Sequence, residues 1–207
     1  GERGTCMISA ELLLDTAGQI VNGNGMTLKA SVEVDWSLQI TGVGAQVNNL
    51  NVDGNVAGIT LSAKRGEGIR VNADDVTLNL CYVYGTPTGG TANGIFATTS
   101  CNRLTLNLCI SEDPGYACYR IDAKTCSLND CQARVVTDDG DSMSRWLVCN
   151  SNVNDLRWNR GVWYSNVPIQ TNTVIDFNGA AADSGRRVHF DGLVIDHVNW
   201  TKIDSAS

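Results

Sequence analysis

The sequence predicts an all-β protein folded as a right-handed parallel β-helix (β-solenoid), with about six to seven coils of 22–28 residues. Three observations predict this fold: a composition poor in helix formers, short segments of alternating apolar and polar residues, and an internal repeat of those segments. The 207 residues include 21 glycines, and only 18% are charged. Most acidic residues are aspartate, and Asp, Asn and Gly favour turns, whereas the helix formers Glu and Lys are scarce. The composition therefore indicates strands joined by tight turns.

An internal repeat is visible in three segments that share one alternating pattern. They are Val76–Cys81 (VTLNLC), Leu104–Cys109 (LTLNLC) and Cys126–Cys131 (CSLNDC). The match extends upstream, because Gly68–Cys81 aligns with Cys118–Cys131 without a gap. Alternate residues are apolar, which is typical of half-buried strands. Because one such coil cannot bury its apolar side alone, the repeat predicts coils stacked into a solenoid.

Weaker copies extend the repeat in both directions. Val188–Leu193 is predicted as a further turn of the solenoid, and the turn-rich Gly85–Gly94 as a loop inserted at one corner. A β-sandwich is disfavoured because it does not repeat at equal offsets, and a leucine-rich repeat because the helical half is missing. The predicted anchors, spaced by 22 or 28 residues, are Leu28, Leu50, Leu78, Leu106, Leu128 and Leu156.

The chain 1–207 is interpreted as a single β-helix domain, with residues 1–25 as an N-terminal cap and 140–207 as a less regular C-terminal part. Because the sequence opens on Gly1 rather than Met, we expect a fragment of a longer protein. The net charge of −7 argues against a nucleic-acid binder, which needs a basic surface. Membrane insertion is not expected either, since no apolar run approaches the roughly 20 residues of a membrane span.

These repeats resemble the right-handed parallel β-helices of the pectate-lyase-like superfamily and, more narrowly, the tailspikes and tail appendages of bacteriophages. The resemblance rests on the three LTLNLC-like segments, on the Gly-Ile pairs at Gly68 and Gly94, and on the Asn, Asp and Gly corners within 20–135. It implies a homotrimer of side-by-side solenoids in the virion tail, assembled in the host cytoplasm. Such proteins recognise bacterial surface polysaccharide and often depolymerise it, as glycoside hydrolases or polysaccharide lyases. No cofactor is predicted.

Two other functions stay open from the sequence. One is a monomeric, secreted polysaccharide lyase or hydrolase of the pectate-lyase-like type, which uses acidic residues and Ca²⁺. Such lyases resemble this chain in architecture, but they need a dense Asp cluster with Lys or Arg bases, and Lys is scarce here. The other is a purely structural β-helical spacer without a ligand.

Three of the eight cysteines, Cys81, Cys109 and Cys131, fall at the same repeat position. We expect them to stack along the rod as small buried thiols that fill an inward position. A zinc site would need closely spaced ligands that converge tetrahedrally, and the two histidines, His189 and His197, lie far along the chain. No metal site is therefore predicted.

Carboxylates are the candidate catalytic groups, because glycosidic hydrolysis needs two carboxyl groups about 5–9.5 Å apart. The pairs that begin at Asp74 and Glu112 are interpreted as turns. Asp138, Asp139 and Asp141 are the predicted catalytic residues, because aromatic and cationic residues follow them. Calcium binding by Asp139 and Asp141 is a further alternative, although the spacing of an EF-hand is not met.

The aromatic and cationic residues after this acidic run are the predicted substrate-binding residues. Trp and Tyr stack on sugar faces, and Arg donates hydrogen bonds to hydroxyl and acidic groups. The same residue types are enriched at protein interfaces, and an open solenoid end also needs a cover. A trimer interface and an end cap therefore stay open as alternatives to a sugar groove. The residues are Trp146, Arg157, Trp158, Arg160, Trp163 and Tyr164.

Overall fold

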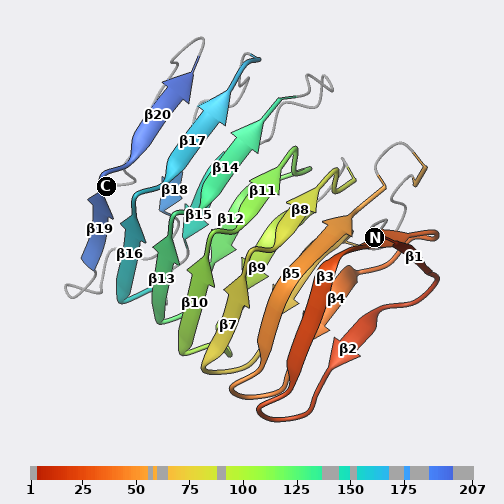
Figure 1. Ribbon diagram of the computed structural model, residues 1–207. Coiled ribbons are helices and arrows are strands. Elements are labelled where there is room, and N and C mark those ends of the chain that lie inside the picture. The colour runs from red at the N-terminus through yellow and green to blue at the C-terminus, as the bar shows by residue number, and fades with distance from the viewer. Residues whose placement is uncertain are drawn as a thin grey trace.

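The computed structural model is a parallel β-solenoid, which confirms the predicted fold class (Figure 1). The structure describes residues 4–55, 58–59, 65–87, 92–136, 145–149, 153–167, 175–177 and 187–197, and every regular element in these ranges is a strand. Within them, no helix is long and apolar enough to cross a membrane.

Each coil passes through a seven-stranded sheet and then through the two arms of a thirteen-stranded sheet. Five complete coils of three separate strands run from β6 to β20, slightly fewer than the six to seven predicted. The seven-stranded sheet contains β2 (Leu12–Leu14), β4 (Trp36–Ile40), β6 (Glu67–Val71), β9 (Asn93–Ala97), β12 (Ala117–Ile121), β15 (Arg145–Cys149) and β18 (Ile175–Phe177).

The long strands β3 (Ile20–Ala30) and β5 (Gln46–Asp53) join the two arms of the larger sheet, and β1 (Thr5–Ile8) pairs with β3. The first arm contains β7 (Val76–Asn79), β10 (Arg103–Asn107), β13 (Thr125–Asn129), β16 (Asp155–Asn159) and β19 (Arg187–Asp191). The second arm contains β8 (Tyr82–Tyr84), β11 (Ile110–Glu112), β14 (Gln132–Val135), β17 (Val162–Ser165) and β20 (Val194–His197).

The strand registers confirm the central part of the predicted leucine column. Leu78, Leu106 and Leu128 are direct partners on β7, β10 and β13. Val47 precedes them on β5, and Trp158 follows them on β16. All five side chains are buried. The further turn predicted at Val188–Leu193 is confirmed, because β19 pairs with β16.

The outer anchors of the predicted column are wrong. Leu156 lies opposite Cys126 rather than Leu128, and Leu28 lies opposite Val52. On β5 the partner of Leu78 is Val47, and Leu50 lies three residues farther along the strand. A shift of two residues keeps a side chain on the same face of a sheet. The alternation alone therefore does not determine which of two inward residues, such as Leu156 and Trp158, belongs to the column.

The cysteines confirm the prediction of buried thiols. All eight are free and seven are buried, with Cys6 as the exposed one. Cys109 donates a hydrogen bond from Sγ to the carbonyl of Leu78 at 3.4 Å, and Cys131 donates one to the carbonyl of Leu106 at 3.5 Å. Burial raises the pKa of Cys101 to about 12. The seven buried thiols therefore act as small core residues.

An asparagine ladder marks the corner between the two arms. Each amide donates a hydrogen bond of 2.8 or 2.9 Å to the side-chain oxygen of the asparagine one coil earlier. In most coils the next residue has a left-handed backbone, for example Leu80 (φ 55°), Leu108 (φ 54°) and Arg160 (φ 51°). This corner sends the chain from the first arm into the second. The ladder contains Asn22, Asn48, Asn79, Asn107, Asn129 and Asn159.

Candidate functional site

The three predicted sugar-binding tryptophans lie inside the solenoid. Trp146 and Trp163 are 1% exposed and Trp158 is 0% exposed. The ring centroids of Trp158 and Trp163 are 5.3 Å apart, and those of Trp146 and Trp163 are 5.5 Å apart. A buried ring offers no face to a sugar, so their assignment to substrate binding is wrong. They form the aromatic core of the C-terminal coils instead.

The other three predicted residues lie on the outer surface but in different places. Arg157 is on the first arm, Tyr164 is on the second arm, and Arg160 occupies the corner between them. Nη2 of Arg160 lies 2.8 Å from Oδ2 of Asp130, and the arginine side chain is largely exposed. The predicted cluster is therefore divided by the corner. Asp138, Asp139 and Asp141 lie outside the described residues.

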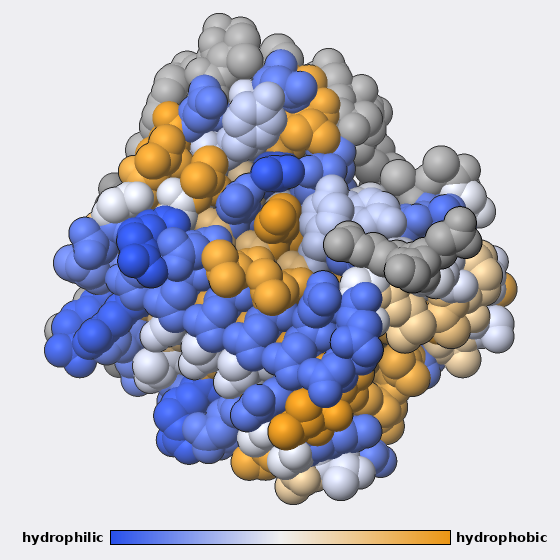
Figure 2. All heavy atoms as spheres, in the orientation of Figure 1, coloured by the Kyte–Doolittle hydropathy of each residue, from blue (hydrophilic) through white to orange (hydrophobic). Residues whose placement is uncertain are grey.

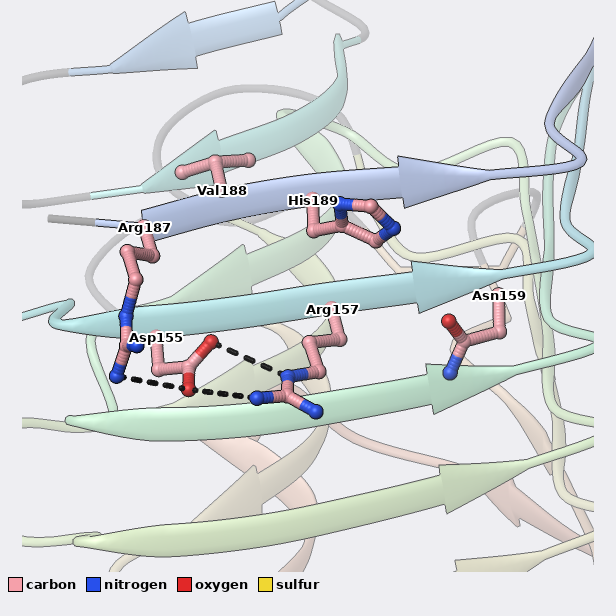
Figure 3. Close-up of a pocket in the computed structure, with 6 residues that line it drawn as sticks. All are labelled: Asp155, Arg157, Asn159, Arg187, Val188 and His189. Atoms are coloured by element: carbon pink, nitrogen blue, oxygen red, sulfur yellow. Dashed lines mark hydrogen bonds and ion pairs between the residues drawn. The ribbon is translucent and has the colours of Figure 1, made fainter.

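Arg157 lines an open hollow of about 650 Å³ on the outer side of β16 and β19 (Figure 3). The two strands pair in parallel, with Arg157 opposite His189 and Asp155 opposite Arg187. Figure 3 shows Asp155 between the two guanidinium groups, with His189 and Asn159 farther along the strands. The lining residues are Asp155, Arg157, Asn159, Arg187, Val188 and His189.

Two guanidinium groups share one carboxylate in this hollow. Nη2 of Arg157 lies 3.4 Å from Oδ2 of Asp155, and Nη2 of Arg187 lies 3.6 Å from the same oxygen. The arginine side chains are 58% and 77% exposed, whereas that of Asp155 is 18% exposed. The hollow therefore has surplus positive charge in a chain whose net charge is −7. Exposed guanidinium groups are donors suited to carboxylate ligands.

Tyr164 lines a second hollow, of about 340 Å³, together with Gln132, Arg134 and Val162. Arg134 is already paired here: its Nε donates to Oε1 of Gln132 at 2.9 Å, and its Nη1 donates to Oε2 of Glu112 at 3.4 Å. The second hollow thus has balanced charge, unlike the first. Figure 2 shows that the outer surface of this sheet is largely hydrophilic, with apolar groups between the polar ones.

The turn interpretation is confirmed for Asp74 and Asp75 but is wrong for Glu112, which is the last residue of strand β11. Both aspartates lie in the turn before β7, and Asp75 has a φ of 59°. Asp74 accepts a hydrogen bond from the side chain of Asn102 at 2.7 Å, and this bond lowers its pKa. The hydrogen bond from Arg103 lowers the pKa of Asp75. These carboxylates therefore hold neighbouring coils together.

The described part of the chain contains no group of three or more His, Cys, Asp or Glu suited to a metal ion.

Arg187 and His189 were not predicted as site residues. A signal was available: the sequence predicts a further turn at Val188–Leu193, and its alternation places His189 outward beside Arg157. The same period-two pattern that points the leucines inward points the polar residues between them outward.

A charged and aromatic row on the seven-stranded sheet was also missed. Arg70 and Arg120 lie over the ring of Phe96, at 5.2 and 4.6 Å from its centroid. Glu67 is 0% exposed, and its Oε2 lies 3.2 Å from Nη1 of Arg70. Burial raises the pKa of Glu67. The Arg70 side chain is only 18% exposed, so this row packs against the sheet rather than forming an open site.

Comparisons with known proteins identify no family. No protein-family model and no curated protein matches the sequence. Among solved structures, the chain is similar to the pectin methylesterase from Aspergillus niger in deglycosylated form, with 12% identity, a TM-score of 0.29, and 91% of this chain and 92% of that chain covered. The penultimately deglycosylated form gives 13% identity, a TM-score of 0.27, and 91% and 81% coverage. Similarity this distant carries no argument about activity.

Proposed function

We propose that this protein binds an acidic polysaccharide through the first hollow. One observation carries the proposal: two exposed guanidinium groups share a single carboxylate, with an imidazole farther along the same hollow, in a chain of net charge −7. An acidic protein with a local cationic hollow attracts an anionic group there and repels it elsewhere.

The chemistry of the hollow suits a uronate or a similar charged sugar. Arg157 and Arg187 donate hydrogen bonds to a carboxylate, while the side-chain oxygens of Asn159 and Asp155 accept hydrogen bonds from sugar hydroxyls. The proposal is binding rather than cleavage. Glycoside hydrolysis uses two carboxyl groups, and among the residues that line this hollow Asp155 alone carries one.

The narrower predictions of the phage resemblance are separate from this proposal. A homotrimer, a place in a virion tail and recognition of a bacterial surface glycan stay predictions. The alternatives of a monomeric lyase or hydrolase and of a structural spacer also stay open, and the binding experiment below separates the spacer from the proposal.

Titration calorimetry with a hexameric oligouronate tests the proposal. We expect saturable binding that weakens as salt rises, because exposed charge pairs are screened. Arg157→Ala and Arg187→Ala should each lower the affinity about tenfold, as expected for one charge-assisted hydrogen bond.

Arg103→Ala is the matched control. Arg103 lies on the same arm, its side chain is 63% exposed and it pairs with Asp75, but it is outside the hollow. It should leave the affinity unchanged. Absence of binding by the unmodified protein, or equal losses from Arg103→Ala and Arg157→Ala, would falsify the proposal.

A further inference from the structure

The second hollow belongs to a row of outward residues along the second arm. The registers place Tyr84, Glu112, Arg134 and Tyr164 opposite one another on β8, β11, β14 and β17. Neighbouring strands are about 4.8 Å apart, so the four side chains form a straight line along the rod. Within this line a charge pair lies between two tyrosine rings, and the same register continues to Asp53 on β5 and Asp196 on β20.

The polar groups of the row are arranged as a connected network. Tyr82, which lies beside Tyr84 with ring centroids 4.8 Å apart, donates a hydrogen bond from its hydroxyl to Oε1 of Glu112 at 2.7 Å. Glu112 accepts a second bond from Arg134 at its other oxygen, and Arg134 also donates to Gln132. The carboxylate and the guanidinium neutralise each other and are held in fixed positions.

This charge balance distinguishes the second hollow from the first. An anionic ligand gains little from a guanidinium whose charge is balanced one to one by a carboxylate, unlike the two guanidinium groups that share Asp155, and it is repelled by Glu112. A neutral sugar fits better, because its hydroxyls both donate and accept hydrogen bonds and its apolar face packs on a tyrosine ring. Tyr164 is half-buried, so its ring is partly fixed yet still reaches the hollow.

We infer that the second hollow is a separate subsite for an uncharged sugar unit, with Tyr164 as the stacking platform and with Arg134 and Gln132 as hydrogen-bonding groups. This inference rests on glycan binding as proposed above, but it uses different residues on a different arm. The two hollows together suit a polysaccharide that contains both acidic and neutral units.

Titration calorimetry with cellohexaose as the neutral probe and the hexameric oligouronate as the acidic probe tests the inference. Tyr164→Ala should lower the affinity for cellohexaose about tenfold, because it removes the ring on which the sugar stacks. The same variant should leave the affinity for the oligouronate unchanged. Tyr164→Phe keeps the ring and should retain the affinity for cellohexaose. Arg157→Ala should show the opposite preference, with a loss for the oligouronate alone.

Tyr116→Ala is the matched control, since Tyr116 contacts Arg145 on the side of the seven-stranded sheet. It should change neither affinity, and thermal unfolding of each variant verifies that the fold is intact. If cellohexaose does not bind, or if Tyr164→Ala and Tyr116→Ala weaken it equally, the second subsite is wrong while the oligouronate result still decides the proposed function. Loss of binding of both probes with Tyr164→Ala in a folded protein also overturns the inference, because the hollows would then not be separate.

Discussion

At the scale of single residues, two leucines occupy backbone conformations that suit other side chains better. Leu80 and Leu108 have left-handed φ values of 55° and 54° and are 52% and 51% exposed. A side chain with a Cβ pays about 1–2 kcal/mol for this conformation, whereas Asn and Asp tolerate it more easily. In other coils the same corner position is occupied by Asn49 and Asp130, which are residue types that tolerate the left-handed conformation.

Replacement of one of these leucines is therefore expected to stabilise the protein. Leu108→Asn should raise the free energy of unfolding by about 1 kcal/mol, because the backbone strain falls while little buried apolar area is lost. Urea unfolding monitored by tryptophan fluorescence measures the change. Leu108→Ala keeps a Cβ in the left-handed region and should give no such gain. An equal gain from Ala and Asn would show that exposure of the leucine, rather than strain, determines the effect.

Residue-scale reasoning also explains why the tryptophans were misplaced from the sequence. Trp158 stands beside Arg157, and a tryptophan next to arginine is typical of a binding surface. Strand alternation puts the two side chains on opposite faces, and the buried leucine two residues before Trp158 already indicated which face is inward. Residue type suggested exposure, while period-two geometry determined burial.

At the scale of elements, the asparagine ladder ties neighbouring coils together at one corner. Asn107 donates to Asn79 and accepts from Asn129, both at 2.8 Å, so it makes two ladder bonds. Asn22 stands at the end of the ladder and only accepts, from Asn48 at 2.9 Å. A buried or half-buried amide left without its partner costs more than an exposed one.

An interior ladder position is therefore expected to matter more than an end position. Asn107→Ala should lower the free energy of unfolding by about 2 kcal/mol and Asn22→Ala by about 1 kcal/mol or less, at about 1 kcal/mol for each lost bond. Urea unfolding measures both. Thr105→Ala changes an outward residue of the same strand outside the ladder and should have the smallest effect. Equal losses at Asn107 and Asn22 would contradict a stability contribution that follows the number of ladder bonds.

The strands also show which part of the fold can be predicted from the sequence. Where three consecutive coils share nearly one motif, as at Leu78, Leu106 and Leu128, the register follows directly from the alignment. Where the motif weakens, coils differ in loop length, and a two-residue slip leaves the pattern unchanged. Only the stacking of whole coils then determines that Trp158, and not Leu156, lies opposite Leu128.

At the scale of the whole molecule, the two ends of the solenoid differ in character. At the N-terminal end, β1 and β2 are the last described strands of their sheets, and large apolar side chains are exposed there. Figure 2 shows hydrophobic groups at this end, at the lower right, as well as others elsewhere on the same face. They include Met7 (55%), Leu12 (39%), Leu13 (49%) and Ile20 (59%). At the other end, β19 presents the charged residues Arg187 and Asp191.

This difference predicts which end promotes self-association. An exposed, apolar edge strand pairs readily with other chains, and a lysine on such an edge opposes pairing. Leu13→Lys should therefore reduce concentration-dependent association, as measured by sedimentation velocity. Leu13 lies opposite Gln39 on the outward side of β2, so its replacement removes no core residue. Val194→Lys changes a residue of similar exposure, 57%, on β20 and should leave association unchanged. A monomer at every concentration would show that the apolar end is tolerated in water, and association abolished by Val194→Lys alone would place the contact at the opposite end of the rod.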